Sequence, residues 1–180
     1  RAARALIAQL ATLHAPEELE LSEVVPATAR DDWRGFDLLP HAAAPTTAEM
    51  GIARRIAPRL QELFEIIGPD LRARVQATAA AKRANQKLTL SRSVIFIDEG
   101  TSAATSFPSL DAALSLRDLG ITVVHLVDHR LKEPSEVTVR ITITDGEATV
   151  EYPDSDTPSV TGVRVDPVDA RLLETIARPI

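Results

Sequence analysis

Apolar residues recur at helical spacing along much of the N-terminal half of the chain. Leucines spaced three and four apart predict a helix over residues 2–14. A similar stripe runs over residues 47–67, where Pro58 is expected to kink or split the helix. A further helix is predicted from Pro69 onward, because proline is well tolerated in the first turn of a helix.

Two short apolar runs follow, and their composition is typical of strands buried on both faces of a sheet. They are Ser93–Asp98 (SVIFID) and Ile121–Val127 (ITVVHLV). Between them, residues 110–119 show a helical pattern, which Ser109 is expected to cap and Gly120 to end. Strand, helix and strand in succession predict a βαβ unit with a right-handed crossover.

The pattern then changes to strict alternation of apolar and polar residues. Val137–Thr144 (VTVRITIT) alternates, Asp145 and Gly146 form a two-residue turn, and residues 147–152 (EATVEY) return. Asp-Gly between alternating segments is a strong local signal for a β-hairpin.

These elements together predict the fold class. A strand is also expected at Leu19–Val25, and a last helix at Asp166 and Pro167, where an acidic cap precedes proline. We therefore predict an α/β protein with a mainly parallel sheet flanked by helices, followed by a C-terminal β-hairpin and a final helix. Residues 1–180 are expected to form a single domain.

Composition narrows this picture. Aromatic residues make up only 3% of the chain, so the core has to be built from aliphatic side chains. The formal net charge of -6 argues against a nucleic-acid surface, which normally shows as a basic stripe. The chain has no cysteine, which excludes disulfides and thiolate metal sites. No apolar run approaches the roughly 18 residues of a membrane span. Because the chain begins at Arg1 without Met, we expect a fragment of a larger protein.

The run SVIFIDEG ends in Asp98 and Glu99, a pattern that nucleotide-hydrolysing motors of the P-loop class need. In such motors the aspartate holds magnesium and the glutamate polarises the attacking water. The alternative is a buried strand that ends in two solvated acids. Neither Gly-x-x-x-x-Gly-Lys-Ser/Thr nor Gly-x-Gly-x-x-Gly occurs in the chain, so these 180 residues lack a loop for the phosphates.

Other candidate chemistry is sparse. The four histidines lack the spacing of a zinc site, and no Gly-x-Ser-x-Gly elbow indicates a hydrolase. We expect His125 to pack within its strand or to make one hydrogen bond. Trp33 and Phe36 lie in the segment DDWRGFDLLPH. They are interpreted either as a hydrophobic plug between elements or as an anchor that contacts a partner.

Several segments occur in an order that resembles the FtsK/SpoIIIE-type ATPases. RALIAQLATLHAPEELEL resembles the helix after the P-loop and the next strand. DDWRGFDLLPH resembles the segment around a Leu-Pro-His motif, in the Trp-containing version found in the EccC ATPases of type VII secretion. SVIFIDEG and LGITVVHLVDHR fall where the family has its magnesium-binding strand and its Gly-Ile-His-Leu-Val-Leu-Ala-Thr-Gln-Arg strand. The resemblance extends from Arg4 to about Arg130, and the hairpin and final helix resemble the tail of the membrane-proximal EccC domain.

This resemblance implies a P-loop NTPase-like fold of the RecA/FtsK type, with the phosphate-binding lysine and serine upstream of this chain. It makes Asp98 the magnesium ligand and, with Glu99, the remnant of a catalytic pair. It places Asp128, His129 and Arg130 at the nucleotide-sensing end of a strand, where the family has Thr-Gln-Arg. An acid near a γ-phosphate repels it, so the site is expected to be degenerate.

The implied function is that of a non-catalytic, ATPase-like domain that couples the membrane complex of a type VII secretion system to active ATPase domains. No cofactor is expected. The implied partners are other domains of the same motor protein, membrane components and secreted WXG-type substrates, without nucleic acid. The parent protein is expected to be hexameric, with this domain at the cytoplasmic face of the bacterial inner membrane. Two alternatives stay open: an active FtsK/SpoIIIE-type domain that binds Mg-ATP, and a plain α/β protein-interaction domain.

Overall fold

The computed structural model describes residues 2–44, 53–100, 102–165, 169 and 171–177. Its helices are α1 (Ala2–Leu13), α2 (Leu60–Arg83) and α3 (Leu172–Ala177). Its strands are β1 (Leu19–Val24), β2 (Ile56–Ala57), β3 (Arg92–Asp98), β4 (Ile121–Leu126), β5 (Arg140–Thr144), β6 (Glu147–Glu151) and β7 (Val160–Arg164). Short 3₁₀ segments are η1 (Ala27–Trp33), η2 (Phe36–Leu38), η3 (Pro40–Ala42) and η4 (Arg130–Lys132).

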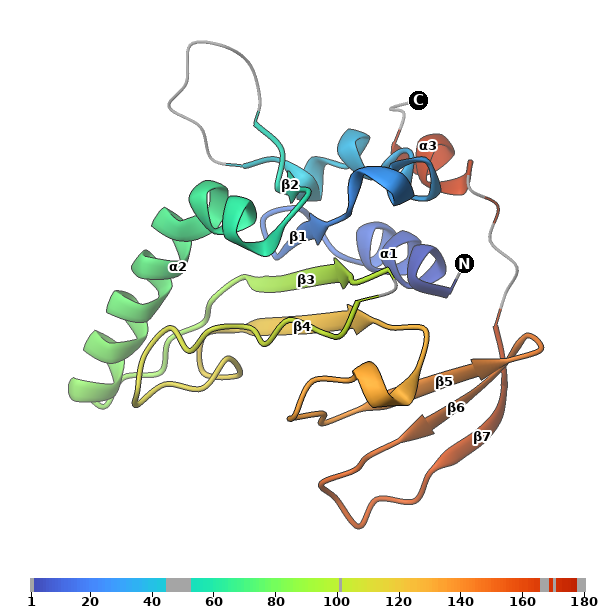
Figure 1. Cartoon of the computed structure of the whole chain (residues 1–180). Helices are drawn as coiled ribbons and strands as arrows, with labels where there is room; N and C mark the ends of the chain where they lie inside the picture. The colour runs from blue at the N-terminus through green and yellow to red at the C-terminus, as the bar shows by residue number, and fades with distance from the viewer. Residues whose placement is uncertain (1, 45–52, 101, 166–168, 170, 178–180) are drawn as a thin grey trace.

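The predicted α/β class is confirmed. Four parallel strands form one sheet in the order β2-β1-β3-β4, and a three-stranded antiparallel sheet, β5-β6-β7, follows it in the chain (Figure 1). Most predicted strands are confirmed close to their predicted positions: β1, the apolar strands β3 and β4, and the hairpin β5-β6.

Both faces of the parallel sheet are covered. Successive side chains of a strand point to opposite faces, so Phe96 packs with Ile7 of α1 on one side, whereas Ile95 packs with Ile67 of α2 on the other. The first face is also covered by η1, η2, η3 and α3, and the second by the segment between β3 and β4. This arrangement explains why β3 reads as an almost continuous apolar run.

Helix α2 corrects the prediction of two helices separated at Pro69. It begins at Leu60 and continues through Pro69 to Arg83. Proline costs the helix one backbone hydrogen bond, but Ile67 and Leu71 continue a buried stripe on the sheet across it. The predicted helix over 47–67 is wrong for residues 53–59, which contain β2 instead, and its first part lies outside the described residues.

The crossover between β3 and β4 also differs from the prediction, because residues 110–119 form turns rather than a helix. The Asp111 carboxylate accepts a hydrogen bond from the Ala113 amide at 2.7 Å. The Asp118 carboxylate accepts two from Ser115, through its amide at 3.0 Å and its hydroxyl at 2.9 Å. Such side-chain bonds offer the backbone an alternative to the helical ladder.

The C-terminal region contains the predicted hairpin and one unpredicted strand. Asp145 and Gly146 both have positive φ angles, 51° and 84°, which suits a two-residue turn between β5 and β6. Strand β7 then pairs with β6 and was not predicted. The predicted helix start at Asp166 and Pro167 lies outside the described residues.

Helix α3 returns to the parallel sheet and packs beside α1 (Figure 1). It lies against Gly35, which has a φ of 91°; a Cβ atom there would lie 2.5 Å from the Glu174 amide nitrogen. Only glycine fits this contact without displacing the helix. In the part of the chain that the structure describes, no helix combines the length and apolar character needed to cross a membrane.

A buried ionic network joins α2 to the amino-terminal side of the sheet. The Arg74 guanidinium donates to Glu20 at 2.9 Å, to Asp70 at 3.2 Å and to the Ser91 carbonyl at 2.7 Å. Arg55 lies 3.2 Å from the same Glu20 carboxylate. Because each buried charge has an opposite partner, the network holds α2 in place without an isolated charge in the core.

Candidate functional site

The carboxyl ends of three parallel strands meet at one edge of the sheet. Val24 of β1 pairs with Ile97 of β3, and Asp98 pairs with Leu126 of β4. Asp98 and Glu99 therefore lie between the ends of β1 and β4, at the edge where open α/β sheets hold ligands.

Both oxygens of the Asp98 carboxylate accept hydrogen bonds from within the chain. Trp33 donates its indole Nε1–H to Oδ2 at 2.9 Å, and the Gly100 amide donates to Oδ1 at 3.0 Å. Trp33 is 7% exposed as a residue, and the centroid of its ring lies 6.4 Å from that of Phe96. The tryptophan therefore covers the acid at the end of β3.

Burial supports the interpretation of Trp33 and Phe36 as a plug. Phe36 is fully buried in the same core cluster as Trp33, between α1 and the sheet. Neither side chain is open to a partner in this conformation. A role for the two as anchors for a partner stays a prediction, and it requires this segment to open.

Glu99 points toward β4 and the segment after β3. Its Oε1 atom accepts a hydrogen bond from the Thr105 amide at 2.8 Å and lies 3.2 Å from Nδ1 of His125. The side chains of Glu99 and His125 are 8% and 11% exposed. The expectation that His125 meets one hydrogen-bond partner is confirmed.

A third acid, Glu23 of β1, belongs to this site and was missed in the sequence. It is 1% exposed, and its Oε1 atom has no hydrogen-bond partner among the described residues. Burial, with smaller contributions from the charges of Asp98 and Asp37, raises the pKa of Glu23 to about 9, and the charge of Arg30 opposes this shift. Glu23 therefore carries a proton at neutral pH. The signal available in the sequence was an acidic residue near the middle of the predicted strand Leu19–Val25.

Hydrogen bonds and protonation at this strand end compete with the binding of magnesium. Within the described ranges, no three His, Asp or Glu side chains are grouped so that they could hold a metal ion. Asp98 already accepts a hydrogen bond on each oxygen, and the neighbouring Glu23 is protonated. A divalent cation needs several oxygen ligands that are free of competing protons.

The sensor-like residues form a separate turn after β4. The Lys132 ammonium lies 2.7 Å from Asp128 and lowers its pKa, and His129 accepts the Leu131 amide at 3.1 Å. All three residues from Asp128 to Arg130 are exposed. No hydrogen bond or ion pair between described residues joins them to Asp98 or Glu99, so their sensing role stays a prediction.

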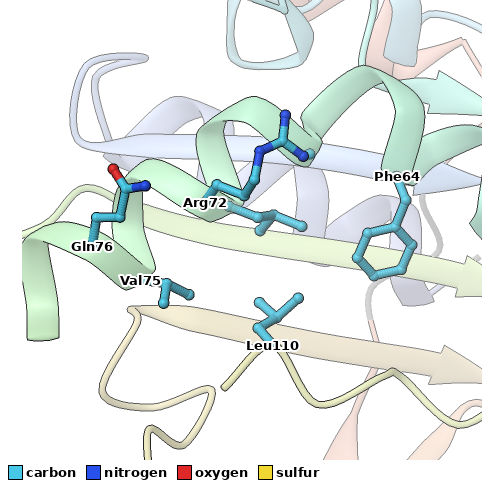
Figure 2. Close-up of a pocket in the computed structure, with 7 residues that line it drawn as sticks. Phe64, Arg72, Val75, Gln76 and Leu110 are labelled. Carbon is cyan, nitrogen blue, oxygen red and sulfur yellow. The ribbon is translucent and has the colours of Figure 1, made fainter.

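A shallow groove of about 320 Å³ lies on the other side of the sheet, between α2 and the segment after β3. Figure 2 shows side chains of α2, among them Phe64 and Val75, on one side of it and Leu110 on the other. Arg72 and Gln76 supply the polar groups. The groove is separate from the acidic strand end, because Phe64 and Leu110 pack in the opposite core cluster from Trp33.

Comparison with known proteins gives one partial match. No family model matches the chain. The ESX secretion system protein EccC of Thermomonospora curvata is 32% identical over 72 residues. The chain is similar to part of EccC. The match covers 39% of this chain and only 6% of that protein's length.

Proposed function

We propose that this chain is an ATPase-like domain of a type VII secretion protein and that it does not hydrolyse ATP. Its role is to couple the membrane complex to the catalytic domains of the same protein, at the cytoplasmic face of the inner membrane. The observation that carries the proposal is the hydrogen bond from Trp33 to Asp98, because it closes the acidic strand end with the protein's own side chain.

Electrostatics supports the same conclusion. Asp98 lies beside a buried, protonated Glu23 and has no basic side chain among its hydrogen-bond partners. A nucleoside triphosphate carries several negative charges. A site lined by acidic residues repels these charges unless magnesium and a lysine neutralise them. Neither a phosphate loop nor its lysine motif occurs in these 180 residues.

The secretion context rests on the ordered FtsK/SpoIIIE-like segments and on the partial similarity to EccC. The proposed partners are other domains of the same protein, membrane components of the secretion system and secreted WXG-type substrates. We also propose that the parent protein is hexameric. The acidic net charge of -6 agrees with protein rather than nucleic acid as the partner.

An active FtsK/SpoIIIE-type ATPase is the second candidate, favoured by the placement of Asp98 and Glu99 at the carboxyl end of β3 beside β4. In that case Mg-ATP binds through a P-loop upstream of this chain. Arg130 then positions phosphate, and Trp33 moves aside when nucleotide enters.

Calorimetric titration of Mg-ATP separates the two candidates. The domain is prepared with its native upstream residues, beside the Asp98→Ala variant and an Asp31→Ala control from the exposed part of the same loop. We expect no binding heat from any of the three proteins. Micromolar binding that is lost in Asp98→Ala but kept in Asp31→Ala contradicts the proposal and assigns the domain to the active ATPases.

The absence of a catalytic role for Asp98 is tested in the full-length protein. Asp98→Ala is expected to leave protein export within about twofold of the unmodified level, because the acid takes no part in hydrolysis. A tenfold loss of rate would correspond to about 1.4 kcal/mol of activation free energy and would indicate a catalytic acid. Loss of export in Asp98→Ala at a normal protein level, together with loss of ATP hydrolysis, contradicts the proposal.

A further inference from the structure

Strand β4 forms one edge of the parallel sheet, and part of its backbone has no partner within the sheet. The carbonyls of Gly120 and Leu126 accept hydrogen bonds from amides in and directly after β3, at 2.9 Å and 3.2 Å. Backbone groups point alternately to the two sides of a strand, so those of Val123 and His125 point away from β3. Among the described residues, no backbone hydrogen bond is made to these outward groups. An edge of this kind accepts a further strand.

Helix α1 has an apolar flank beside this edge. Leu6 and Leu13 are 37% and 75% exposed. They follow Arg4 by two and nine residues, so both lie on the opposite side of the helix from it. Arg4 donates to the backbone carbonyl of Asp32 in η1, and in Figure 1 α1 lies between α3 and β4. The two exposed leucines therefore lie on the flank of α1 that is turned toward the β4 edge.

The connections of the sheet decide which segment fits this edge. Strand β1 connects to β3 through α2, and β3 connects to β4 through residues 99–120. Both connections cover the α2 face of the sheet and step from β1 toward β4. Helix α1 covers the opposite face and leads into β1. Crossovers between parallel strands are right-handed, so a helix on the opposite face connects strands that step in the opposite direction. A strand before α1 therefore lies on the β4 side of β1, where β3 and β4 already fill the nearest positions.

We propose that the residues preceding α1 in the full-length protein form a strand that pairs in parallel with the open edge of β4. The direction of α1 agrees with this. Arg4, in its first turn, contacts Asp32, and the adjacent Trp33 bonds to Asp98 at the end of β3. Helix α1 thus begins at the carboxyl edge of the sheet, where a parallel strand also ends, and a short loop connects the two.

The added strand accounts for two features of the structure together. The outward backbone groups of Val123 and His125 gain hydrogen-bond partners, which strand edges otherwise find only in water. Leu6 and Leu13 gain apolar side chains to cover, so the flank of α1 becomes part of the core. This inference does not depend on the proposed role in secretion or on nucleotide binding.

Amide hydrogen exchange tests the pairing in the 180-residue chain and in the same chain extended by about 20 native residues before Arg1. In the 180-residue chain, the amides of Val123 and His125 are expected to exchange at least about tenfold faster than those of Thr122 and Val124, which face β3. In the extended chain this difference is expected to disappear. A difference that persists in the extended chain overturns the proposal. Its absence already in the 180-residue chain also overturns it, and a dependence on protein concentration then assigns the edge to a second copy.

Thiol labelling gives a separate reading of the α1 flank. The chain contains no cysteine, so Leu6→Cys and Thr12→Cys each introduce a single thiol. Thr12 is also exposed, and it is turned about 120° around the helix from Leu6. The alkylation rate of Leu6→Cys is expected to be severalfold lower in the extended chain than in the 180-residue chain, whereas that of Thr12→Cys stays the same. Equal rates for Leu6→Cys in the two proteins contradict the placement of the strand beside α1.

Discussion

The two sheets of this protein use similar residues but bury them differently. In β3 of the parallel sheet, Ile95, Phe96 and Ile97 are at most 1% exposed, because helices or loops cover both faces. In β5 of the antiparallel sheet, Ile141 and Ile143 are about half exposed. The difference teaches that a strand pattern in a sequence predicts which residues share a face, but not whether anything covers that face.

The largest expected effect follows from burial in the parallel sheet. Phe96→Ala is expected to lower the free energy of unfolding by about 3–5 kcal/mol, because it removes a fully buried ring from the core. Ile143→Ala, in the antiparallel sheet, is expected to cost less than about 1 kcal/mol, because the side chain is 47% exposed. Urea unfolding followed by circular dichroism measures both, and equal losses contradict the comparison.

The parallel sheet also contains an acid with a strongly raised pKa, for which the antiparallel sheet has no counterpart among the described residues. Glu23 has a pKa of about 9 when folded and an ordinary value of 4.5. Between these values the folded state holds a proton that the unfolded state has released. Stability from Glu23 is thus complete below about pH 4.5 and is lost as pH rises through about 9.

We therefore expect the wild-type free energy of unfolding to fall by up to about 4 kcal/mol between pH 5 and pH 8, at about 1.4 kcal/mol per pH unit for one proton. Glu23→Gln mimics the protonated acid and should flatten this dependence. Glu18→Gln, an exposed change just before β1, should keep it. A Glu23→Gln profile that is as steep as wild type assigns the pH dependence to other groups.

The smallest effect concerns the hairpin turn. Gly146→Ala places a Cβ at a φ of 84° and is expected to cost about 1–2 kcal/mol. Amide hydrogen exchange should show the loss in β5 and β6, while β3 keeps its protection, since the two sheets share no paired strands. Asp145→Asn, which tolerates a left-handed conformation, serves as the control. Equal loss of protection in β3 shows that the sheets unfold together.

Local signals predicted the parts of the fold that local chemistry determines. Asp145-Gly146 fixed the hairpin, and the apolar run in β3 gave a strand buried on both faces. Pro69 misled the prediction because packing of Ile67 and Leu71 on the sheet outweighs one lost backbone hydrogen bond. The segment 110–119 misled it because Asp111 and Asp118 bind nearby amides, which periodicity alone does not reveal.

The candidate site was predicted in part for the same reason. Asp98 and Glu99 could be placed at a strand end from the run SVIFIDEG, and their position is confirmed. Their partners could not be predicted, because Trp33 lies 65 residues away in the chain and meets Asp98 only through the fold. The place of Glu23 in the site could not be predicted without the register between β1 and β3. That register sets Glu23 opposite Phe96 and on the same face as Asp98.

The position of Trp33 has a consequence for spectroscopy. It is the chain's single tryptophan, and its indole is buried against Phe96 and bonded to Asp98. Its fluorescence therefore originates at one point, the end of β3. Emission at tryptophan wavelengths therefore follows the parallel sheet and the surroundings of that carboxylate, whereas unfolding of the antiparallel sheet needs another signal, such as that of Tyr152 directly after β6.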